Sequence, residues 1–324
     1  MIVRWGLERL PGVLAEAGVE RPLAVTTPRW AGLELGVAGL FDGVRAHVPT
    51  ETVEAAARAA EGHDGLLAVG GGSAIDTAKA VSARTGLAVV SVPTTYSGAE
   101  WTTSFGIRDE VRGMKGGGGG ALLAGIVYAP ELTLSLPRGE TAGTALNALA
   151  HCAEALYVEG RNDQADRHAL AGAAAVSRAL PLVLEDGANR TARKELLEGA
   201  MHAGAALAGA GLGLAHAMAQ ALGGRFGVPH GALNALCLPP ALRFNEPAAS
   251  AALARLAGAL GATDPAAKAE ELAGLGGFRR LRDLGIPEEE LAEVAEAVVA
   301  RPGARVNPRR ASAAEVANLL LEAW

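Results

Sequence analysis

The sequence predicts an α/β domain built on an open, doubly wound and mostly parallel sheet, followed by an all-helical domain. Over the first ~140 residues, short apolar segments alternate with amphipathic helical ones, which is typical of βαβ units. Beyond residue 139, Ala, Leu and Glu dominate, β-branched runs disappear and helical periodicity continues to Trp324. A glycine-rich turn, in LAVGGGSAIDTAKA at 67–80, joins an apolar segment to a helical one. We therefore expect one domain at 1–139 and a second at 140–324.

The segments that predict strands are short and apolar, as in a parallel sheet covered by helices on both faces. They are PLAVTT at 22–27, VRAHVP at 44–49, GLLAV at 65–69, AVVSVP at 88–93 and GIVYAP at 125–130. Helices are predicted between them at 50–60, where Thr50 is a candidate cap, and at 73–83. Amphipathic helices are also predicted in the second half at 249–260 and 287–300.

Two segments interrupt this alternation. WTTSFGIRD at 101–109 is interpreted as an excursion, such as a hairpin. GMKGGGGGALLAG at 113–125 contains five consecutive glycines at 116–120, which have no side chains to pack. We expect this run to be a mobile surface loop or lid, with Lys115 beside it.

Composition narrows the class of protein. The net charge of −6 argues against a nucleic-acid-binding protein, which would need a basic face. Cys152 and Cys237 lie far apart without a CxxC motif, so neither a disulfide framework nor a thiolate metal site is indicated. The first residues, MIVRWGLERLPG, lack an apolar targeting segment, and no apolar run reaches the ~20 residues that span a bilayer. We expect a cytoplasmic protein without membrane contact.

The turn at Gly70, Gly71 and Gly72 has two interpretations. Glycine accepts positive φ angles, so the run could be no more than a tight turn. Alternatively, bare backbone N–H groups and the start of the following helix could bind a phosphate. Ligands of doubly wound sheets bind at the carboxyl ends of strands, where this turn is predicted to lie.

A second run, VPTTYSGAE at 92–100, also follows a predicted strand. Its hydroxyl groups, on Thr94, Thr95 and Ser97, could line the same crevice as the glycines. Taken alone, an ordinary Thr/Ser-rich turn is the more economical interpretation.

Polar residues recur on the predicted helices of the second half. Asn147 and His151 are four residues apart and share a helix face, as do His216 and Gln220. His230 follows at a Pro-His-Gly turn that opens another helix. Three histidines could converge on one divalent metal ion, or could form a metal-free polar pocket in which a histidine donates a proton.

Several motifs occur together in one order along the chain. They are GGGSAIDTAK, PTTYSGAE, YAPELTLSLP, LNALAHCAEALY, and LAHAMAQALGG followed by VPHG and LPPALRFN. With them the chain resembles the iron-containing (group III) alcohol dehydrogenases, which have the dehydroquinate-synthase-like fold. The segments AVTTPRW and NPRRASAAEVANLLLEAW further resemble the maleylacetate reductase branch.

The resemblance implies a nicotinamide dinucleotide cofactor in the first domain. The matching positions are Gly70, Gly71, Gly72, Ser73, Thr94, Thr95, Ser97 and Thr27. NADH is the expected cofactor. NADPH acceptance is also expected, because Thr27 stands where many relatives carry an Asp and Arg29 is close by.

The resemblance also places Asn147, His151, His216 and His230 at the four metal-ligand positions of the alcohol dehydrogenases. Asn147 replaces an Asp, which removes the anionic ligand, and maleylacetate reductases are generally thought to work without metal. We therefore expect metal-free turnover, with His151, His216 and His230 as the ligands if a divalent metal is bound. Glu154 is the nearest acidic residue on the Asn147 helix.

The function implied is NAD(P)H-dependent reduction of maleylacetate to 3-oxoadipate, in aromatic-compound degradation, by a homodimer acting on a small molecule. Candidates for binding the substrate's charges are Lys115 and Arg225, although Arg225 could equally be a surface charge. The substrate stays open because Gln220, Asn234 and Pro240 replace histidines of relatives. Alternatives are a metal-dependent (Fe or Zn) alcohol dehydrogenase or aldehyde reductase, a sugar-phosphate cyclase, and a silent binding module.

Overall fold

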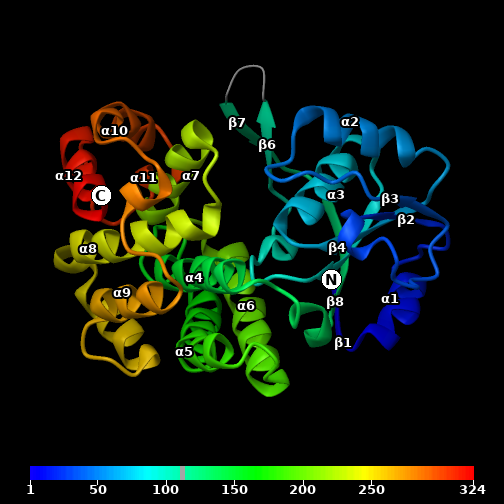
Figure 1. Ribbon diagram of the computed structural model, residues 1–324, viewed down its shortest axis with the longest axis horizontal. Helices are drawn as coiled ribbons and strands as arrows, with labels where there is room; N and C mark the ends of the chain where they lie inside the picture. Colours follow the sequence, from blue (N-terminus) through cyan, green and yellow to red (C-terminus); the bar gives the residue numbers. More distant parts are fainter. Residues whose placement is uncertain (110–113) are drawn as a thin grey trace. The chain divides into compact units, whose positions relative to one another are not determined.

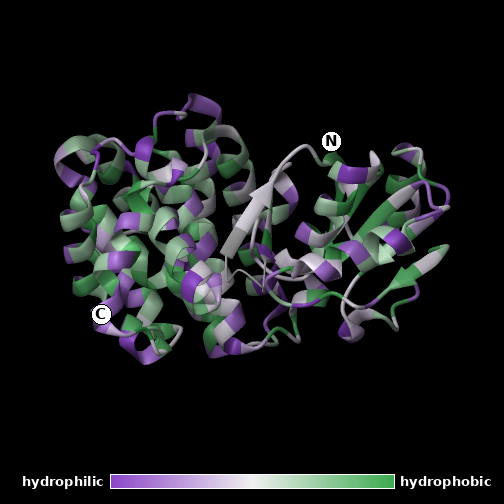
Figure 2. Ribbon diagram, turned by 90° about the horizontal axis from the view of Figure 1, so that it is seen from above, coloured by the Kyte–Doolittle hydropathy of each residue, from purple (hydrophilic) through white to green (hydrophobic). Residues whose placement is uncertain are grey.

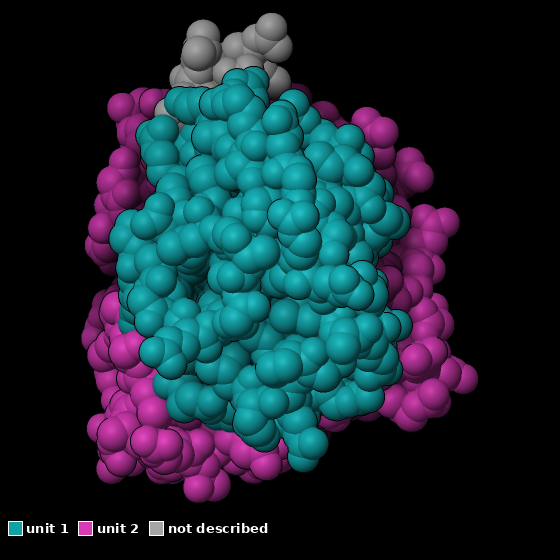
Figure 3. All heavy atoms as spheres, turned by 90° about the vertical axis from the view of Figure 1, so that its right-hand side faces the viewer, with its two compact units in different colours: residues 1–95, 99–133 teal, residues 96–98, 134–324 magenta. Residues whose placement is uncertain are grey.

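The computed structural model describes residues 1–109 and 114–324. The chain divides into two compact units (Figure 3). The N-terminal unit comprises residues 1–95 and 99–133, and the helical unit comprises residues 96–98 and 134–324. The short segment 96–98 therefore belongs to a different unit from the residues on either side of it.

A six-stranded parallel sheet forms the centre of the N-terminal unit, with strand order β1-β8-β5-β4-β2-β3. The strands are β1 (Ile2–Trp5), β2 (Pro22–Val25), β3 (Gly39–Phe41), β4 (Gly65–Gly70), β5 (Ala88–Pro93) and β8 (Leu122–Tyr128). The predicted class, an α/β part with a parallel sheet followed by a helical part, is confirmed (Figure 1).

Helices cover both faces of this sheet because successive strand residues point to opposite sides. Leu66 and Ala68 of β4 pack in one cluster with α2 (Thr50–Ala59) and α3 (Gly72–Thr85). Leu67 and Val69 pack in a second cluster with α1 (Leu10–Glu16). Green, hydrophobic strands dominate this sheet in Figure 2.

One predicted strand is absent from the sheet, and one strand of the sheet was not predicted. The segment 44–49 is not a strand: β3 lies earlier, and His47 and Val48 both have positive φ angles, which end extended pairing. Val48 O accepts a hydrogen bond from Arg108 N, which holds this turn against β6. The edge strand β1 was not predicted from its sequence, IVRW, which is only partly buried and carries a charged residue.

Three of the five glycines in the run 116–120 lie in a strand rather than in the loop that the sequence suggested, while Gly119 and Gly120 follow it. Met114–Gly118 forms β7, which pairs antiparallel with β6 (Phe105–Asp109), so the predicted hairpin is confirmed. A Cβ on Gly117 would lie 2.8 Å from Phe105 O, and one on Gly118 would lie 2.6 Å from the Phe105 ring. Glycine keeps its backbone hydrogen-bonding groups, and here its missing side chain lets β7 lie close to Phe105. The side chain of Lys115 lies outside the described residues.

The helical unit consists of packed helices that continue to the C-terminus (Figure 1). They are α4 (Arg138–Ala155), α5 (Asp163–Glu185), α6 (Arg190–Ala210), α7 (Leu214–Phe226), α8 (His230–Leu260), α9 (Pro265–Leu275), α10 (Leu291–Val299), α11 (Pro302–Arg305) and α12 (Ala313–Ala323). Several begin with a side-chain cap, as at Asn162, Asn189, Asp264 and Ser312, which accept hydrogen bonds from first-turn N–H groups.

Short 3₁₀ helices connect these elements. They are η1 (Leu7–Arg9), η2 (Pro28–Trp30), η3 (Ala99–Trp101), η4 (Pro130–Thr133), η5 (Leu281–Leu284) and η6 (Glu288–Glu290). Within the described residues, no single helix is long and apolar enough to cross a membrane. One strongly bent pair, α6 with α7, passes the same test by length and composition only.

Candidate active site

The glycine turn connects β4 to α3 and lies beside the carboxyl end of the neighbouring strand β5. β4 ends at Gly70, Gly71 is the N-cap residue of α3, and the helix begins at Gly72. Thr94, at the end of β5, donates its backbone N–H to Gly70 O at 3.0 Å. A Cβ on Gly71 would lie 2.8 Å from the methyl carbon of Thr95. Glycine is therefore required here by the neighbouring threonine as well as by any ligand.

The polar groups of this turn fit a phosphate-bearing cofactor. A helix N-terminus presents unpaired N–H groups and a partial positive charge, and Ser73 lies in the first turn of α3. The Thr95 hydroxyl is buried, and no described residue forms a hydrogen bond with it. A buried hydroxyl without a partner is costly, and an incoming ligand would supply that partner. The residues present thus fit a nicotinamide dinucleotide.

Thr27 lies at the same edge of the sheet. It follows β2, which pairs with β4, and it precedes η2. The adjacent Thr26 donates its hydroxyl to Val69 O at 2.7 Å, which fixes the end of β2 to β4. Arg29, in η2, lies with its guanidinium carbon 5.1 Å from the centroid of the Trp30 ring.

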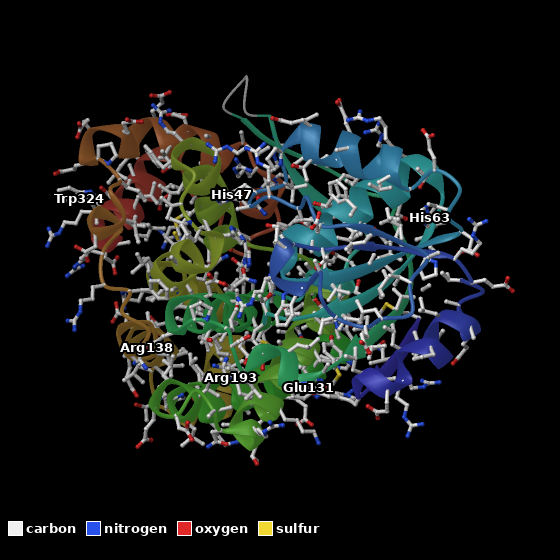
Figure 4. All side chains as sticks on the ribbon, turned by 45° about the vertical axis from the view of Figure 1, so that its right-hand side comes forward. His47, His63, Glu131, Arg138, Arg193 and Trp324 are labelled. Carbon is white, nitrogen blue, oxygen red and sulfur yellow. The ribbon has the colours of Figure 1, made fainter. Side chains whose placement is uncertain are left out.

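Tyr96, Ser97 and Gly98 pack within the helical unit rather than with the glycine turn. Tyr96 N donates to Thr144 Oγ1 at 3.3 Å, and the Tyr96 hydroxyl lies 3.2 Å from Nη1 of the buried Arg193, labelled in Figure 4. Gly98 has a φ of +73°, and a Cβ there would lie 3.2 Å from the Cα of Gly204 in α6. The predicted residue Ser97 places its backbone carbonyl in the helical unit.

The four predicted polar residues of the helical unit come together. Asn147 and His151 lie on α4, His216 lies on α7, and His230 is the first residue of α8. The rings of His151 and His216 stack with centroids 4.6 Å apart and an angle of 11° between their planes. The centroids of His216 and His230 are 5.7 Å apart. Spacing along each helix and the Pro-His-Gly turn had indicated these residues, and the fold unites them.

Glu154 orients His216. Its carboxylate, fully buried on α4, accepts hydrogen bonds from Gly213 N at 2.7 Å and from His216 N at 3.2 Å. It lies 2.6 Å from His216 Nδ1, so this ring nitrogen carries a proton and donates it. Glu154, singled out in the sequence as the nearest acidic residue on the Asn147 helix, thus contacts His216 on the facing helix.

Two carboxamides link the remaining groups. Asn147 Nδ2 donates to Ser97 O at 3.1 Å, which directs Asn147 Oδ1 towards Asn234 and His216. Asn234 Nδ2 donates to Asn147 Oδ1 at 2.7 Å and contacts His230 Nε2 at 2.9 Å. Because an amide nitrogen can only donate, His230 Nε2 is the acceptor. His216 Nε2 lies 3.3 Å from Asn147 Oδ1.

His151 is chemically distinct within this cluster. It forms no hydrogen bond with any described residue, and its Nδ1 is fully buried. Burial, together with the charges of His216 and His230, holds the pKa of His151 well below its ordinary value. This imidazole is therefore neutral near pH 7.

This arrangement does not fit a divalent metal ion. Histidine ligands must direct ring lone pairs at one point about 2.0–2.1 Å away, whereas the near-parallel rings of His151 and His216 direct theirs side by side. The lone pair of His230 Nε2 and the oxygen of Asn147 already accept from Asn234. Within the described residues, no group of three or more His, Cys, Asp or Glu side chains could hold a metal.

Arg225 does not serve the candidate role of binding substrate charge. It lies at the C-terminal end of α7 and forms ion pairs with Glu290 and with Glu293, the latter at 2.7 Å. Its charge is therefore compensated, and the alternative interpretation as a surface charge is the one that fits.

Sequence reasoning treated Asn234 only as a departure from relatives and did not consider Arg193. Asn234 is one helical turn after His230, and this i, i+4 spacing was a usable signal for a shared face. Arg193 carried no such signal, because its partners Tyr96 and Thr141 are distant in sequence.

The chain belongs to the iron-containing alcohol dehydrogenase family and is an oxidoreductase. The family model "Iron-containing alcohol dehydrogenase" matches residues 4–124, and "Fe-containing alcohol dehydrogenase family, C-terminal" matches residues 141–324. Enzymes of this family generally use NAD(H) and a divalent metal ion.

Individual relatives are similar over almost the whole chain. A maleylacetate reductase of Sphingobium indicum is 37% identical over 98% of this chain and 92% of its own. The crystal structure of maleylacetate reductase from Agrobacterium tumefaciens has a TM-score of 0.91 and 32% identity, covering 100% of this chain and 95% of its own. The crystal structure of an iron-containing alcohol dehydrogenase from Corynebacterium glutamicum has a TM-score of 0.92 and 31% identity, covering 100% of this chain and 94% of its own.

Proposed function

We propose that this oxidoreductase reduces maleylacetate to 3-oxoadipate with NADH and without a metal ion. The observation that carries the proposal is the network in which Asn234 links Asn147 and His230 at the positions where the alcohol dehydrogenases bind metal. The similarity to maleylacetate reductases over nearly the full length supports the choice of substrate.

The reaction requires a hydride, a proton and stabilisation of a developing negative charge. A nicotinamide dinucleotide held by the glycine turn and Thr95 would supply the hydride. Hydride addition at the alkene carbon β to the ketone moves the electron pair of the double bond towards the ketone oxygen. The resulting enolate takes a proton at the carbon α to the ketone, which gives 3-oxoadipate. Fixed donors near the enolate oxygen lower the barrier most, because the charge develops there.

The helical unit offers suitable groups for this charge. His151 is neutral and makes no hydrogen bond with the described residues, so it is the candidate donor to the enolate oxygen. His216, oriented by Glu154, and His230, fixed by Asn234, hold the cluster in place. In this proposal the glycine turn and Thr95 bind the cofactor.

Finer expectations complete the proposal. NADPH is accepted with little discrimination, since Thr27 brings no carboxylate to repel a 2′-phosphate and Arg29 lies two residues further on. The enzyme acts as a homodimer in the cytoplasm, in the degradation of aromatic compounds. These points rest on the resemblance to the maleylacetate reductase branch.

The test compares substrates with and without a chelator. Loss of reduced-nicotinamide absorbance is followed with maleylacetate and with simple aldehydes, before and after treatment with EDTA and removal of the chelated metal. We expect turnover of maleylacetate that survives the treatment, and poor turnover of aldehydes. Aldehyde reduction that is lost on chelation and restored by zinc or iron would identify a metal-dependent alcohol dehydrogenase instead.

A further inference from the structure

Arg301 is a cation that forms no ion pair with the part of the chain that the structure describes. It lies between α10 and α11, is half-buried, and donates from Nη1 to Gln220 Oε1 at 3.4 Å. Its Nε is fully buried and has no hydrogen-bond partner among the described residues. None of the ion pairs formed among the described side chains, those of residues 1–108 and 116–324, includes Arg301.

Burying a guanidinium without a carboxylate partner costs free energy. Burial removes water from the guanidinium and lowers the pKa of Arg301, and no carboxylate among the described side chains opposes the effect. Arg225 and Arg255 show the usual solution: Arg225 pairs with two glutamates, and Arg255 lies 2.6 Å from the buried Asp166. A half-buried cation that lacks such a partner is suited to an anionic ligand, which would supply the missing acceptor.

Gln220 connects Arg301 to the histidine cluster. It lies on α7 one turn after His216, so the two side chains project from the same side of the helix. The amide oxygen of Gln220 can only accept hydrogen bonds. By accepting from Arg301 Nη1, it holds the guanidinium beside the helical turn of α7 that follows His216. Gln220 also borders a hollow of about 600 Å³ together with Glu159, Pro302 and Gly303, while Arg301 immediately precedes this lining in the sequence and does not itself line the hollow.

We propose that Arg301, positioned by Gln220, binds a carboxylate of the substrate and so sets the preference of this enzyme for dicarboxylates. The proposal rests on the proposed function for the substrate's identity. Arg301 thereby takes the role that the sequence had suggested for Arg225. A planar guanidinium presents two parallel N–H groups to a carboxylate, which a single ammonium group does not.

The variants Arg301→Met and Arg301→Lys test this assignment, with Arg225→Met as the matched control. The readouts are KM and kcat for maleylacetate and for its ester at the carboxylate remote from the alkene, the dissociation constant of adipate by calorimetry, and that of NADH. We expect Arg301→Met to raise KM for maleylacetate and the adipate dissociation constant roughly 10- to 100-fold, because it removes a charged hydrogen-bond partner. Affinity for NADH and the circular dichroism spectrum stay as in the wild type.

Three further results separate binding from a structural role. Arg301→Lys recovers part of the loss, Arg225→Met leaves both constants unchanged, and Arg301→Met reduces the preference for the diacid over its ester. Equal KM values and equal adipate binding in wild type and Arg301→Met would overturn the assignment, as would a wild type that does not bind adipate. A wild type that binds adipate through Arg301 but does not reduce maleylacetate would contradict the proposed function alone.

Discussion

The glycine turn of the N-terminal unit consists mainly of backbone groups, whereas the histidine cluster of the helical unit consists of side chains. The turn relies on backbone groups of consecutive residues, Gly70 to Gly72, and on one neighbouring threonine. The cluster relies on side chains from α4, α7 and α8, and its hydrogen bonds between different helices join residues 62 to 87 positions apart. Backbone sites are therefore evident in a short stretch of sequence, whereas side-chain networks emerge only from the packing of several helices.

The difference also decides how each site responds to substitution. A backbone site is disturbed by added atoms, while a side-chain network is disturbed by lost or altered partners. The following variants test that distinction, beginning with the largest expected effect.

Removing the His151 imidazole should damage catalysis most. We expect His151→Ala to lower kcat by about 10²- to 10⁴-fold, the usual contribution of a positioned proton-transfer or donor group. Affinity for NADH should not change, since the substitution leaves every residue of the glycine turn in place. His168→Ala is the matched control, because His168 contacts His202 on α6 and lies outside the cluster. A kcat close to wild type in steady-state kinetics would remove His151 from the mechanism.

Adding a side chain at Gly71 should weaken cofactor binding. Gly71→Val should raise the NADH dissociation constant at least ~10-fold, measured by fluorescence titration. The Cβ lies 2.8 Å from the Thr95 methyl group, so Thr95 is displaced and its hydroxyl is misdirected. Gly12→Ala is the control, since a Cβ there meets nothing within 4 Å.

The double variant Gly71→Val with Thr95→Ala sharpens the test. If displacement of Thr95 is the whole cause, the double variant binds NADH as Thr95→Ala does. If the valine occupies the space of the pyrophosphate, the double variant stays as weak as Gly71→Val. Unchanged binding in both would refute the account of the turn.

Restoring a carboxylate at position 147 should convert the cluster towards a metal site. In Asn147→Asp, an oxygen replaces the nitrogen that donates to Ser97 O, so two acceptors lie about 3.1 Å apart. We expect a loss of roughly 1–3 kcal/mol in stability when metal is withheld, because a buried hydrogen bond becomes a repulsion. Added zinc should recover part of this loss and bind more tightly than to the wild type, as followed by thermal unfolding and elemental analysis. Equal zinc content in both proteins would contradict this prediction.

Glu100→Gln should have the smallest effect, visible only in the pH dependence of stability. Glu100 is buried in the N-terminal unit, where Oε1 accepts from the Tyr128 hydroxyl at 2.8 Å and Oε2 has no partner among the described residues. Burial raises the pKa of Glu100 above its ordinary value of 4.5. The folded state therefore retains this proton more strongly, and its stabilising effect is lost as pH rises above 4.5 through the folded value.

Urea unfolding of wild type and Glu100→Gln at about pH 5 and pH 8 measures this effect. We expect the variant to gain stability relative to wild type at the higher pH, on the order of 1 kcal/mol. The low pKa of His151 acts with the opposite sign, favouring the fold as pH rises towards 6.5, but it is common to both proteins. A difference between the two proteins that does not depend on pH would show that Glu100 is not the group responsible.

Much of the fold was accessible from the sequence because it depends on local patterns. The predicted segments 22–27, 65–69, 88–93 and 125–130 overlap β2, β4, β5 and β8. The errors at 44–49 and 116–120 arise where tertiary contacts override composition, since Arg108 fixes one segment and Phe105 accommodates the other.

The site was accessible only in part. Helical spacing predicted that Asn147 and His151 share one helix face, and the motifs gave the residue types. The contacts of Asn234 and Glu154, and the contrast between Arg225 and Arg301, depend on how α4, α7, α8 and α10 pack. No short-range pattern encodes that Arg225 contacts glutamates whereas Arg301, among the described residues, contacts a glutamine side chain.

The segment Tyr96–Gly98 limits how this protein can be dissected. A fragment that starts at Leu134 would contain every helix of the second unit, yet it would lack Ser97 O, the acceptor for Asn147, and the Tyr96 hydroxyl that Arg193 contacts. Expressed alone, such a fragment should fold with a disordered cluster. A circular permutant opened in the 110–113 region would keep Tyr96, Ser97 and Gly98 covalently attached to both units.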